Sequence, residues 1–150
     1  MPNRRKCSAG FTLTELVVVI VIGTVLSAFA ISRINTKSFD TEGFANETAA
    51  MLRYAQKLAV SQRRTVAVVI AGGSIQLCYT DTSCSGGAVR KPPSADPFTV
   101  NAPSGVTLGG SSFTFNSLGQ PSAGGTIAVN GDVTRNITVE AETGYVRYVP

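Results

Sequence analysis

Seventeen consecutive residues without a charge, Leu16 to Ser32, leave few options for the first part of this chain. A helix from Phe11 to Ile34 would reach roughly 35 Å, which is enough to cross the hydrocarbon core of a bilayer. Residues 17–22 are all β-branched and favour a strand in water, whereas in lipid only a helix satisfies every backbone group within the segment. The run therefore predicts a transmembrane helix over residues 11–34.

Basic residues precede this run and indicate its orientation. Arg4, Arg5 and Lys6 place the N-terminus in the cytoplasm by the positive-inside rule, so that everything after residue 34 lies on the outer side of the membrane. A secretory signal peptide is the alternative. It fits poorly because the small residues, Ser8-Ala9-Gly10, stand before the apolar run and not after it.

Composition excludes several classes of function. The chain has 150 residues, enough for one domain with a modest core. Without the basic leader, 10 basic residues face 9 acidic ones, so the net charge of +4 is weak evidence for nucleic-acid binding. The absence of histidine excludes a Ser-His-Asp triad and a His-ligated metal site. Glu140 and Glu142 would fall on one face if the predicted strand continues to them. A solvated edge explains them better than catalysis, and we expect neither an enzyme nor a cofactor.

The cysteines indicate the redox compartment. Cys7 lies in the basic leader, which leaves Cys78 and Cys84 as a pair. Two cysteines so close in sequence are expected to form a disulfide in an oxidising compartment. A structural zinc would need four ligands, and the chain offers no others of the right kind.

The remainder, residues 35–150, predicts a head of α+β class in which a helix packs on an antiparallel sheet. Apolar residues recur at steps of three and four from Asp40 to Arg63, with Asp40 or Thr41 as the helix cap. Arg63 and Arg64 would end the helix and complement its dipole. The loop from Asp81 to Pro97 has little hydrophobic pattern and is expected to be exposed. Strands are predicted at Thr65–Ala71, Ser74–Thr80, Phe98–Val100, Ser112–Phe115, Thr126–Val129, Ile137–Ala141 and Tyr145–Val149, the first two joined by a hairpin at Gly72-Gly73.

The start of the apolar run resembles a known family. The segment G-F-T-L-T-E-L at residues 10–16 is similar to the processing site of type IV prepilins. The resemblance implies that a prepilin peptidase removes residues 1–10, cutting between Gly10 and Phe11, and methylates the new amine of Phe11. The helix over residues 11–34 would then serve as membrane anchor and filament core.

The resemblance implies a role for Glu15 in assembly. A lone carboxylate in hydrocarbon costs about 3 kcal/mol, so it should have a partner. In assembled pilins the partner implied is the α-amine of Phe11 on a neighbouring subunit. The alternative is a carboxylate at the level of the lipid headgroups, where its cost is small. Two positions depart from the family pattern: Thr14 replaces an aliphatic residue, and Ser32 replaces the proline that kinks the helix of many major pilins.

Three further segments resemble the GspH/FimT family of minor pilins: residues 52–57 with 63–66, residues 113–122, and residues 144–148. The cysteine spacing together with residues 53–57 is similar to the MSHA-type minor pilins. The resemblance implies a structural subunit that initiates or caps a type IV pilus or a type II secretion pseudopilus. Its partners would be other pilins, the assembly platform and the prepilin peptidase, and its location the bacterial inner membrane with a periplasmic head.

DNA capture during uptake is the alternative function in this family. Members that bind DNA carry a C-terminal Gly-Arg-x-Arg motif, whereas this chain has Gly144-Tyr145-Val146-Arg147. Phosphate neutralisation needs clustered cations. Arg90 and Lys91 with Arg147 are the candidate contacts to a nucleic acid, and solvated charge is the simpler explanation of all three.

Overall fold

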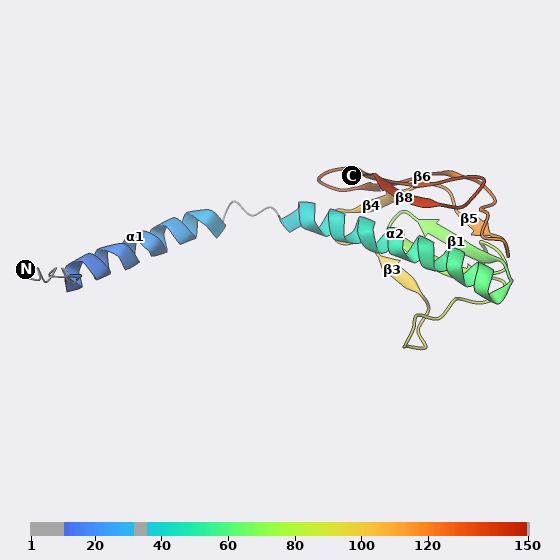
Figure 1. Ribbon diagram of the computed structural model, residues 1–150, viewed down its shortest axis with the longest axis horizontal. Coiled ribbons are helices and arrows are strands. Elements are labelled where there is room, and N and C mark those ends of the chain that lie inside the picture. Colours follow the sequence, from blue (N-terminus) through green and yellow to red (C-terminus); the bar gives the residue numbers. More distant parts are fainter. Residues whose placement is uncertain (1–10, 32–35, 150) are drawn as a thin grey trace, which may run out of the picture. The chain divides into compact units, whose positions relative to one another are not determined.

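The computed structural model describes residues 11–31 and 36–149 (Figure 1). The predicted leader, with Gly10, and residues 32–34 of the predicted membrane segment lie outside the described residues. The chain divides into two units, residues 1–35 and residues 36–150. We call them the N-terminal unit and the head and describe each by itself.

In the N-terminal unit, helix α1 spans Leu13–Ile31. Thr12 caps it: the hydroxyl oxygen of Thr12 accepts the backbone N–H of Glu15 at 3.2 Å. Further along, the hydroxyls of Thr24 and Ser27 donate to backbone carbonyls one turn earlier, at 2.8 and 2.7 Å. The hydroxyls of Thr24 and Ser27 are thus satisfied within the helix.

The sequence predicts a transmembrane helix over residues 11–34, and α1 occupies the middle of that range. Within residues 11–31 and 36–149, no helix has the length and apolar character that crossing a membrane requires.

Helix α2 spans Thr36–Gln62 in the head and begins four residues before the predicted start. The predicted cap at Asp40 or Thr41 is wrong, because no glycine or proline interrupts the residues before them. Thr41 lies inside the helix, where it is buried and its hydroxyl donates to the carbonyl of Lys37 at 3.0 Å.

The end of α2 is a Schellman turn. Arg63 adopts a left-handed conformation, with φ of 51°. The N–H groups of Arg63 and Arg64 donate to the carbonyls of Val60 and Ala59 at 3.3 and 3.2 Å. The guanidinium of Arg64 lies 3.8 Å from the centre of the Tyr79 ring. The basic pair therefore ends the helix, as predicted, and also attaches its end to the first sheet.

The first sheet contains four antiparallel strands in the order β3-β2-β1-β5. The predicted hairpin is confirmed: β1 and β2 pair from Val66↔Tyr79 to Ala71↔Ser74, with Gly72-Gly73 as the turn. The strands are β1 Val66–Ala71, β2 Ser74–Tyr79, β3 Thr99–Asn101 and β5 Phe113–Phe115.

A second antiparallel sheet has the order β4-β6-β7-β8. Its strands are β4 Thr107–Gly109, β6 Gly125–Asn130, β7 Arg135–Val139 and β8 Val146–Val149. Strand β4 is absent from the sequence-based prediction, because three residues ending in glycine carry no alternating pattern. The backbone N–H of Leu108 donates to the carbonyl of Gly72 at 2.7 Å, which joins β4 to the hairpin of the first sheet.

Helix α2 packs on both sheets and closes one core between them (Figure 1). The helix buries a stripe of apolar residues: Phe44, Ala45, Ala49, Met51, Leu52, Ala55 and Ala59. Phe115 and Leu77 from the first sheet and Ile137 and Val129 from the second meet this stripe in one cluster of buried residues. The α+β class is confirmed, with two sheets in place of the single one expected.

The connection between β2 and β3 is exposed over most of its length, as predicted, except around the buried Val89. A disulfide joins Cys78 and Cys84, with their Cα atoms 5.1 Å apart. Val89 is buried and its N–H donates to the carbonyl of Leu77 at 2.9 Å, so the connection returns along the edge of β2. The predicted exposure therefore fails for this part of the loop, because one apolar residue holds it to the sheet.

Candidate functional site

The first turn of α1 contains the residues with a predicted role in processing and assembly. Phe11 is 81% exposed, and Glu15 lies in the first helical turn. Thr12 and Glu15 have the spacing of a capping box, and the Glu15 N–H makes the bond expected of it. A carboxylate at this position also complements the positive end of the helix dipole. The local structure thus accounts for an acidic residue in the first turn of α1.

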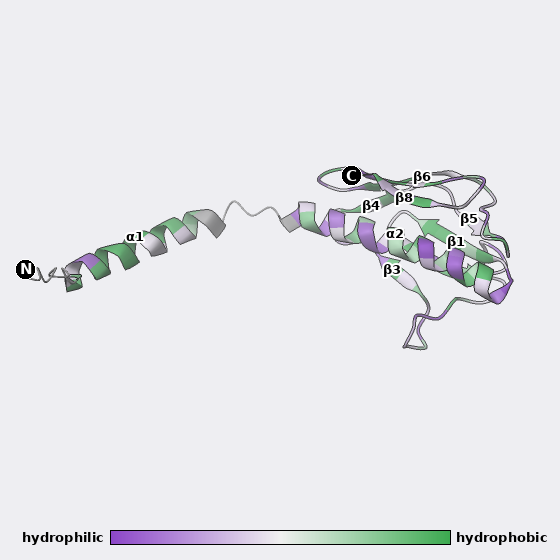
Figure 2. Cartoon of the chain, in the orientation of Figure 1, coloured by the Kyte–Doolittle hydropathy of each residue, from purple (hydrophilic) through white to green (hydrophobic). Residues whose placement is uncertain are grey.

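Apolar side chains surround α1 on all sides. Figure 2 shows the helix as hydrophobic along most of its length. The large apolar side chains that the structure describes on α1 are all 49% exposed or more: Leu13, Leu16, Val17, Val18, Val19, Ile20, Val21, Ile22, Val25, Leu26 and Phe29. A helix that is hydrophobic all round is stable only when other apolar material covers it. The exposed side chains of α1 therefore require other apolar groups to cover them.

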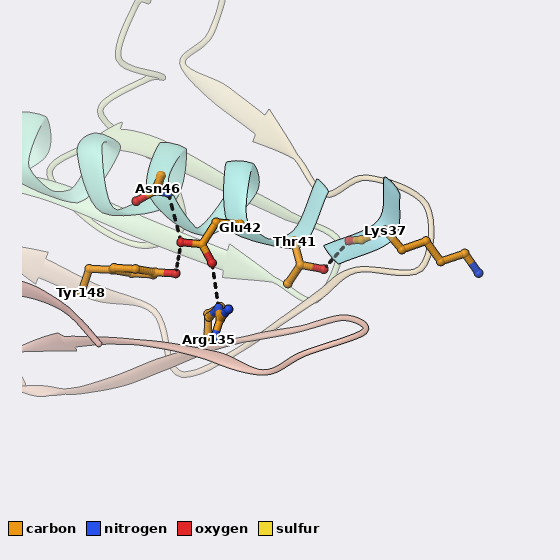
Figure 3. Close-up of polar contacts among 6 residues, drawn as sticks. All are labelled: Lys37, Thr41, Glu42, Asn46, Arg135 and Tyr148. Atoms are coloured by element: carbon orange, nitrogen blue, oxygen red, sulfur yellow. Dashed lines mark hydrogen bonds and ion pairs between the residues drawn. The ribbon is translucent and has the colours of Figure 1, made fainter. Parts of the chain in front are cut away.

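In the head, a polar cluster joins the beginning of α2 to the second sheet (Figure 3). The two carboxylate oxygens of Glu42 accept hydrogen bonds from different strands. Oε1 accepts the hydroxyl of Tyr148 on β8 at 2.5 Å, and Oε2 forms an ion pair with Nε of Arg135 on β7 at 2.7 Å. The amide of Asn46 approaches Oε1 at 3.4 Å. One carboxylate thus holds two strands against the helix.

These contacts change the acidity of the groups involved. The hydrogen bond from Tyr148 and the positive charge of Arg135 hold the pKa of Glu42 below its ordinary value of 4.5. Burial, together with the hydrogen bond to the Glu42 carboxylate, raises the pKa of Tyr148 to about 12. Glu42 is therefore ionised and Tyr148 protonated throughout the neutral range.

Replacing Glu42 with glutamine is expected to weaken the dependence of head stability on acid. Because the folded pKa of Glu42 is lowered, its carboxylate stabilises the head above about pH 4.5, and this contribution is lost as the pH falls through the folded pKa. Denaturant unfolding at neutral pH and at about pH 3 measures the loss. The wild-type protein should lose more stability than the variant between these two values.

Glu140→Gln is the matched control for this measurement, since Glu140 is an exposed carboxylate of the same sheet region. Asp81, whose pKa the hydroxyls and N–H groups of Ser85 and Ser83 lower to about 2, titrates in all three proteins and cancels in the comparison. An equal loss of stability in Glu42→Gln and wild type would show that the cluster in Figure 3 does not stabilise the head.

A second polar cluster lies near the other end of α2. The side-chain amide of Gln56 donates to the carbonyls of Gly119 and Thr143, at 3.0 and 2.8 Å. The amide of Gln120 donates to the carbonyl of Glu142 at 3.2 Å. Gln56 therefore connects the turn after β5 with the turn between β7 and β8. The first turn falls in a segment that carries the family resemblance and the second directly precedes another, but the sequence contains no signal that α2 joins them.

The structure does not gather the candidate nucleic-acid contacts into one patch. Arg90 and Lys91 lie in the connection from β2 to β3, where Arg90 donates to the carbonyl of Ala95 at 3.0 Å and Lys91 lies 5.8 Å from the centre of the Phe98 ring. Arg147 is exposed on β8, which belongs to the second sheet. No interaction among the described residues links Arg147 with the other two.

Metal binding has no visible basis in the described part of the chain, where no three of its Cys, Asp and Glu side chains gather as ligands. Glu140 and Glu142 are both exposed, the former directly after β7 and the latter in the turn that follows, so they do not share a strand face.

A capped apolar helix at the N-terminus and a head in which a second helix packs on antiparallel sheets define a pilin-like subunit. The family model described as type II transport protein GspH matches residues 45–144, and that of the prokaryotic N-terminal methylation motif matches residues 5–31. The chain belongs to the GspH family and is a minor pilin or pseudopilin. Members of this family are structural subunits.

Solved structures share the fold. The type IV minor pilin FimU of Pseudomonas aeruginosa, in a P21 crystal, is 21% identical with a TM-score of 0.57, covering 77% of this chain and 92% of FimU. The minor pseudopilin EpsH of the type 2 secretion system of Vibrio cholerae is 12% identical with a TM-score of 0.59, covering 73% of this chain and 96% of EpsH. No curated protein matches the chain.

Proposed function

We propose that this minor pilin or pseudopilin initiates or caps the assembly of a type IV pilus or a type II secretion pseudopilus. The observation that carries the proposal is α1, whose apolar side chains are exposed on every face while the head is closed around its own core. Such a helix requires cover, and the helices of other filament subunits supply it.

The N-terminal unit supports a specific route to the filament. Prepilin peptidase cuts between Gly10 and Phe11 and methylates the amine of Phe11, and the match to the N-terminal methylation motif supports this step. Residues 11–34 then anchor the chain in the inner membrane, with the N-terminus in the cytoplasm and the head in the periplasm. The disulfide in the head is consistent with an oxidising periplasm.

Glu15 directs assembly in this proposal. The Thr12 cap leaves the carboxylate in the first turn of α1, four residues from Phe11. On entering the filament, the carboxylate pairs with the amine of Phe11 on a neighbouring subunit, which neutralises both charges. A subunit in the wrong register keeps an uncompensated charge in an apolar environment.

Deleting the gene tests the function, with the wild-type copy restored as control. We expect sheared surface filaments, or secretion of type II substrates in a strain with that system, to disappear and to return with the restored copy. Unchanged filaments and unchanged secretion would contradict the proposal, and DNA uptake in the same strain would then be measured.

Gly10→Trp in the restored copy tests processing. A bulky residue at the cleavage position should block removal of the leader, so the chain keeps its full mass and does not restore assembly. Mass spectrometry of the membrane-bound protein distinguishes the two forms, and methylation adds about 14 Da to the mature one. A mature mass in the Gly10→Trp variant would refute the cleavage site.

A further inference from the structure

A groove lies between β5 of the first sheet and β6 of the second (Figure 1), and its cavity measures about 280 Å³. The buried side chains of Phe113, Ile127 and Val139 line it, together with the exposed residues Ser111 and Thr126. We call these five residues the β5–β6 groove. An apolar cavity of about 150 Å³ holds a benzene molecule, so the groove has room for one large apolar side chain and part of its backbone.

One wall of the groove is the edge of β6 beyond the end of β4. Strand β4 ends at Gly109, which pairs with Ala128, and continuing that register would place Ser111 opposite Thr126. No backbone hydrogen bond joins Ser111 to Thr126 in the described part of the head, because the chain leaves β6 at Gly110, where φ is +139°. The place beside Thr126 that a longer β4 would occupy is therefore open.

The backbone groups of Thr126 point into this open place. The N–H of Glu140 donates to the carbonyl of Tyr145 at 3.0 Å, so the even-numbered residues of β7 bond to β8. The odd-numbered residues of β7 then bond to odd-numbered residues of β6, since the strands pair as Ile137↔Ile127. The N–H and C=O of Thr126 therefore face away from β7 and have no partner among residues 36–149. An unpaired strand edge of this kind is a template for pairing with another chain.

Gly125 leaves space in the groove beside this edge. It lies two residues before Ile127 on β6 and therefore on the same face of the strand, yet no atom lies within 4 Å of a Cβ built there. None of the residues that line the cavity carries a charge, which gives a phosphate group nothing to pair with. Unpaired peptide groups beside an apolar pocket instead fit an extended peptide, whose backbone pairs with the edge while a side chain enters the pocket.

We propose that the β5–β6 groove receives an extended peptide segment of a different filament subunit. The segment adds to β6 beside Thr126, exchanges hydrogen bonds with its N–H and C=O, and places one apolar side chain over Phe113 and Ile127. We exclude a second copy because such a contact is heterologous and would continue from copy to copy, whereas an initiating or capping subunit stands at the end of a row. The inference rests on the proposed function and names the surface through which the head joins its neighbour.

Hydrogen exchange at the backbone amide of Thr126 tests strand addition on the purified full chain in detergent micelles. The probes are acetylated and amidated peptides of the form Thr-Thr-X-Thr-Thr, in which X is Ala, Val, Leu or Phe. At millimolar concentration the Leu or Phe peptide should slow this exchange at least about ten-fold, because the amide gains a hydrogen bond. The same peptide with methylated backbone nitrogens should not slow it, since the methyl groups remove the donors and block the approach of a strand. No slowing by any of these peptides, or equal slowing by the methylated one, would overturn the inference.

Gly125→Leu fills the groove and is the variant for the same measurement. Because a Cβ at this position meets no atom, the head should keep its Tm to within about 2 °C, while the peptide no longer slows exchange at Thr126. Gly43→Leu on α2, where a Cβ also meets no atom within 4 Å, is the matched control and should leave the protection unchanged. Ser111→Trp, at an exposed position of the groove, blocks it independently should Gly125→Leu lower the Tm.

Assembly in the deletion strain separates this inference from the proposed function. Gly125→Leu should lower the recovery of sheared filaments, or secretion, at least about ten-fold relative to the restored wild-type copy, although its leader is removed. Wild-type assembly with both Gly125→Leu and Ser111→Trp, in a strain where deletion abolishes assembly, would overturn the inference and leave the proposed function standing. Where deletion changes neither filaments nor secretion, the proposed function fails, and the exchange at Thr126 still decides whether the groove binds a strand.

Discussion

Replacing Gly144 with alanine is expected to destabilise the head by about 3 kcal/mol or more, because strain and a steric clash add. Gly144 has a φ of +67°, which disfavours any side chain. A Cβ at this position would lie 2.2 Å from the carbonyl oxygen of Gly119 and 2.7 Å from the side-chain nitrogen of Gln56. The new methyl group would therefore separate the two turns that Gln56 joins.

Thermal unfolding of the purified protein checks this, with an expected fall in Tm of roughly 10 °C or more. Gly125→Ala is the matched control, since no atom lies within 4 Å of a Cβ at that position. Gln56→Ala should cost less than Gly144→Ala, because it removes two hydrogen bonds without introducing a clash. A Tm of Gly144→Ala within about 2 °C of the wild-type value would contradict the described packing of the two turns.

Replacing Glu15 with leucine is expected to reduce recovery in sheared filaments about ten-fold or more, while the leader is still removed. Leucine preserves the helix, because the cap bond to Thr12 uses the backbone N–H of residue 15 and not its side chain. What is lost is the carboxylate, and with it the pairing with the Phe11 amine of a neighbour. The loss of about 3 kcal/mol of discrimination in an apolar environment gives an effect of this size.

Quantitative immunoblots of sheared filaments and of the membrane fraction measure incorporation and processing separately. Glu15→Asp keeps the charge and should retain part of the incorporation. Glu140→Gln removes an exposed carboxylate of the head and should change neither quantity. Normal recovery of Glu15→Leu would exclude the pairing and would leave Glu15 with its local role at the start of α1.

The strand pattern of the head was predictable to a large extent. The hairpin around Gly72-Gly73 formed as predicted, because alternating residues and a glycine turn act over a few neighbouring positions. Strand β4 and the start of α2 were not predictable in this way. β4 exists because Leu108 enters the core and its N–H reaches the Gly72 carbonyl, which depends on a partner 36 positions earlier in the sequence.

The polar clusters that join α2 to the strands and turns could not be predicted from the sequence either. From the sequence, Glu42 is only an acidic residue near the start of a helix. In the head it binds Tyr148, 106 residues further along the chain, and Arg135, 93 residues further along. Gln56 has no distinguishing pattern and joins turns that lie 63 and 87 residues away. No local rule brings such residues together, since the distances between them depend on how α2 packs on the two sheets.

The sequence by itself determined the features that a short segment carries: the apolar helix, the acid in its first turn and the two cysteines that pair. The leader and the cut between Gly10 and Phe11 stay predictions from the same short segment. Only the tertiary structure decided that there are two sheets, that Arg147 lies in a different sheet from the strands that Arg90 and Lys91 connect, and that Gln56 joins two distant turns. The physical reason is range: propensity, capping and periodicity act within a few residues, whereas burial and long-range hydrogen bonds depend on the whole folded head.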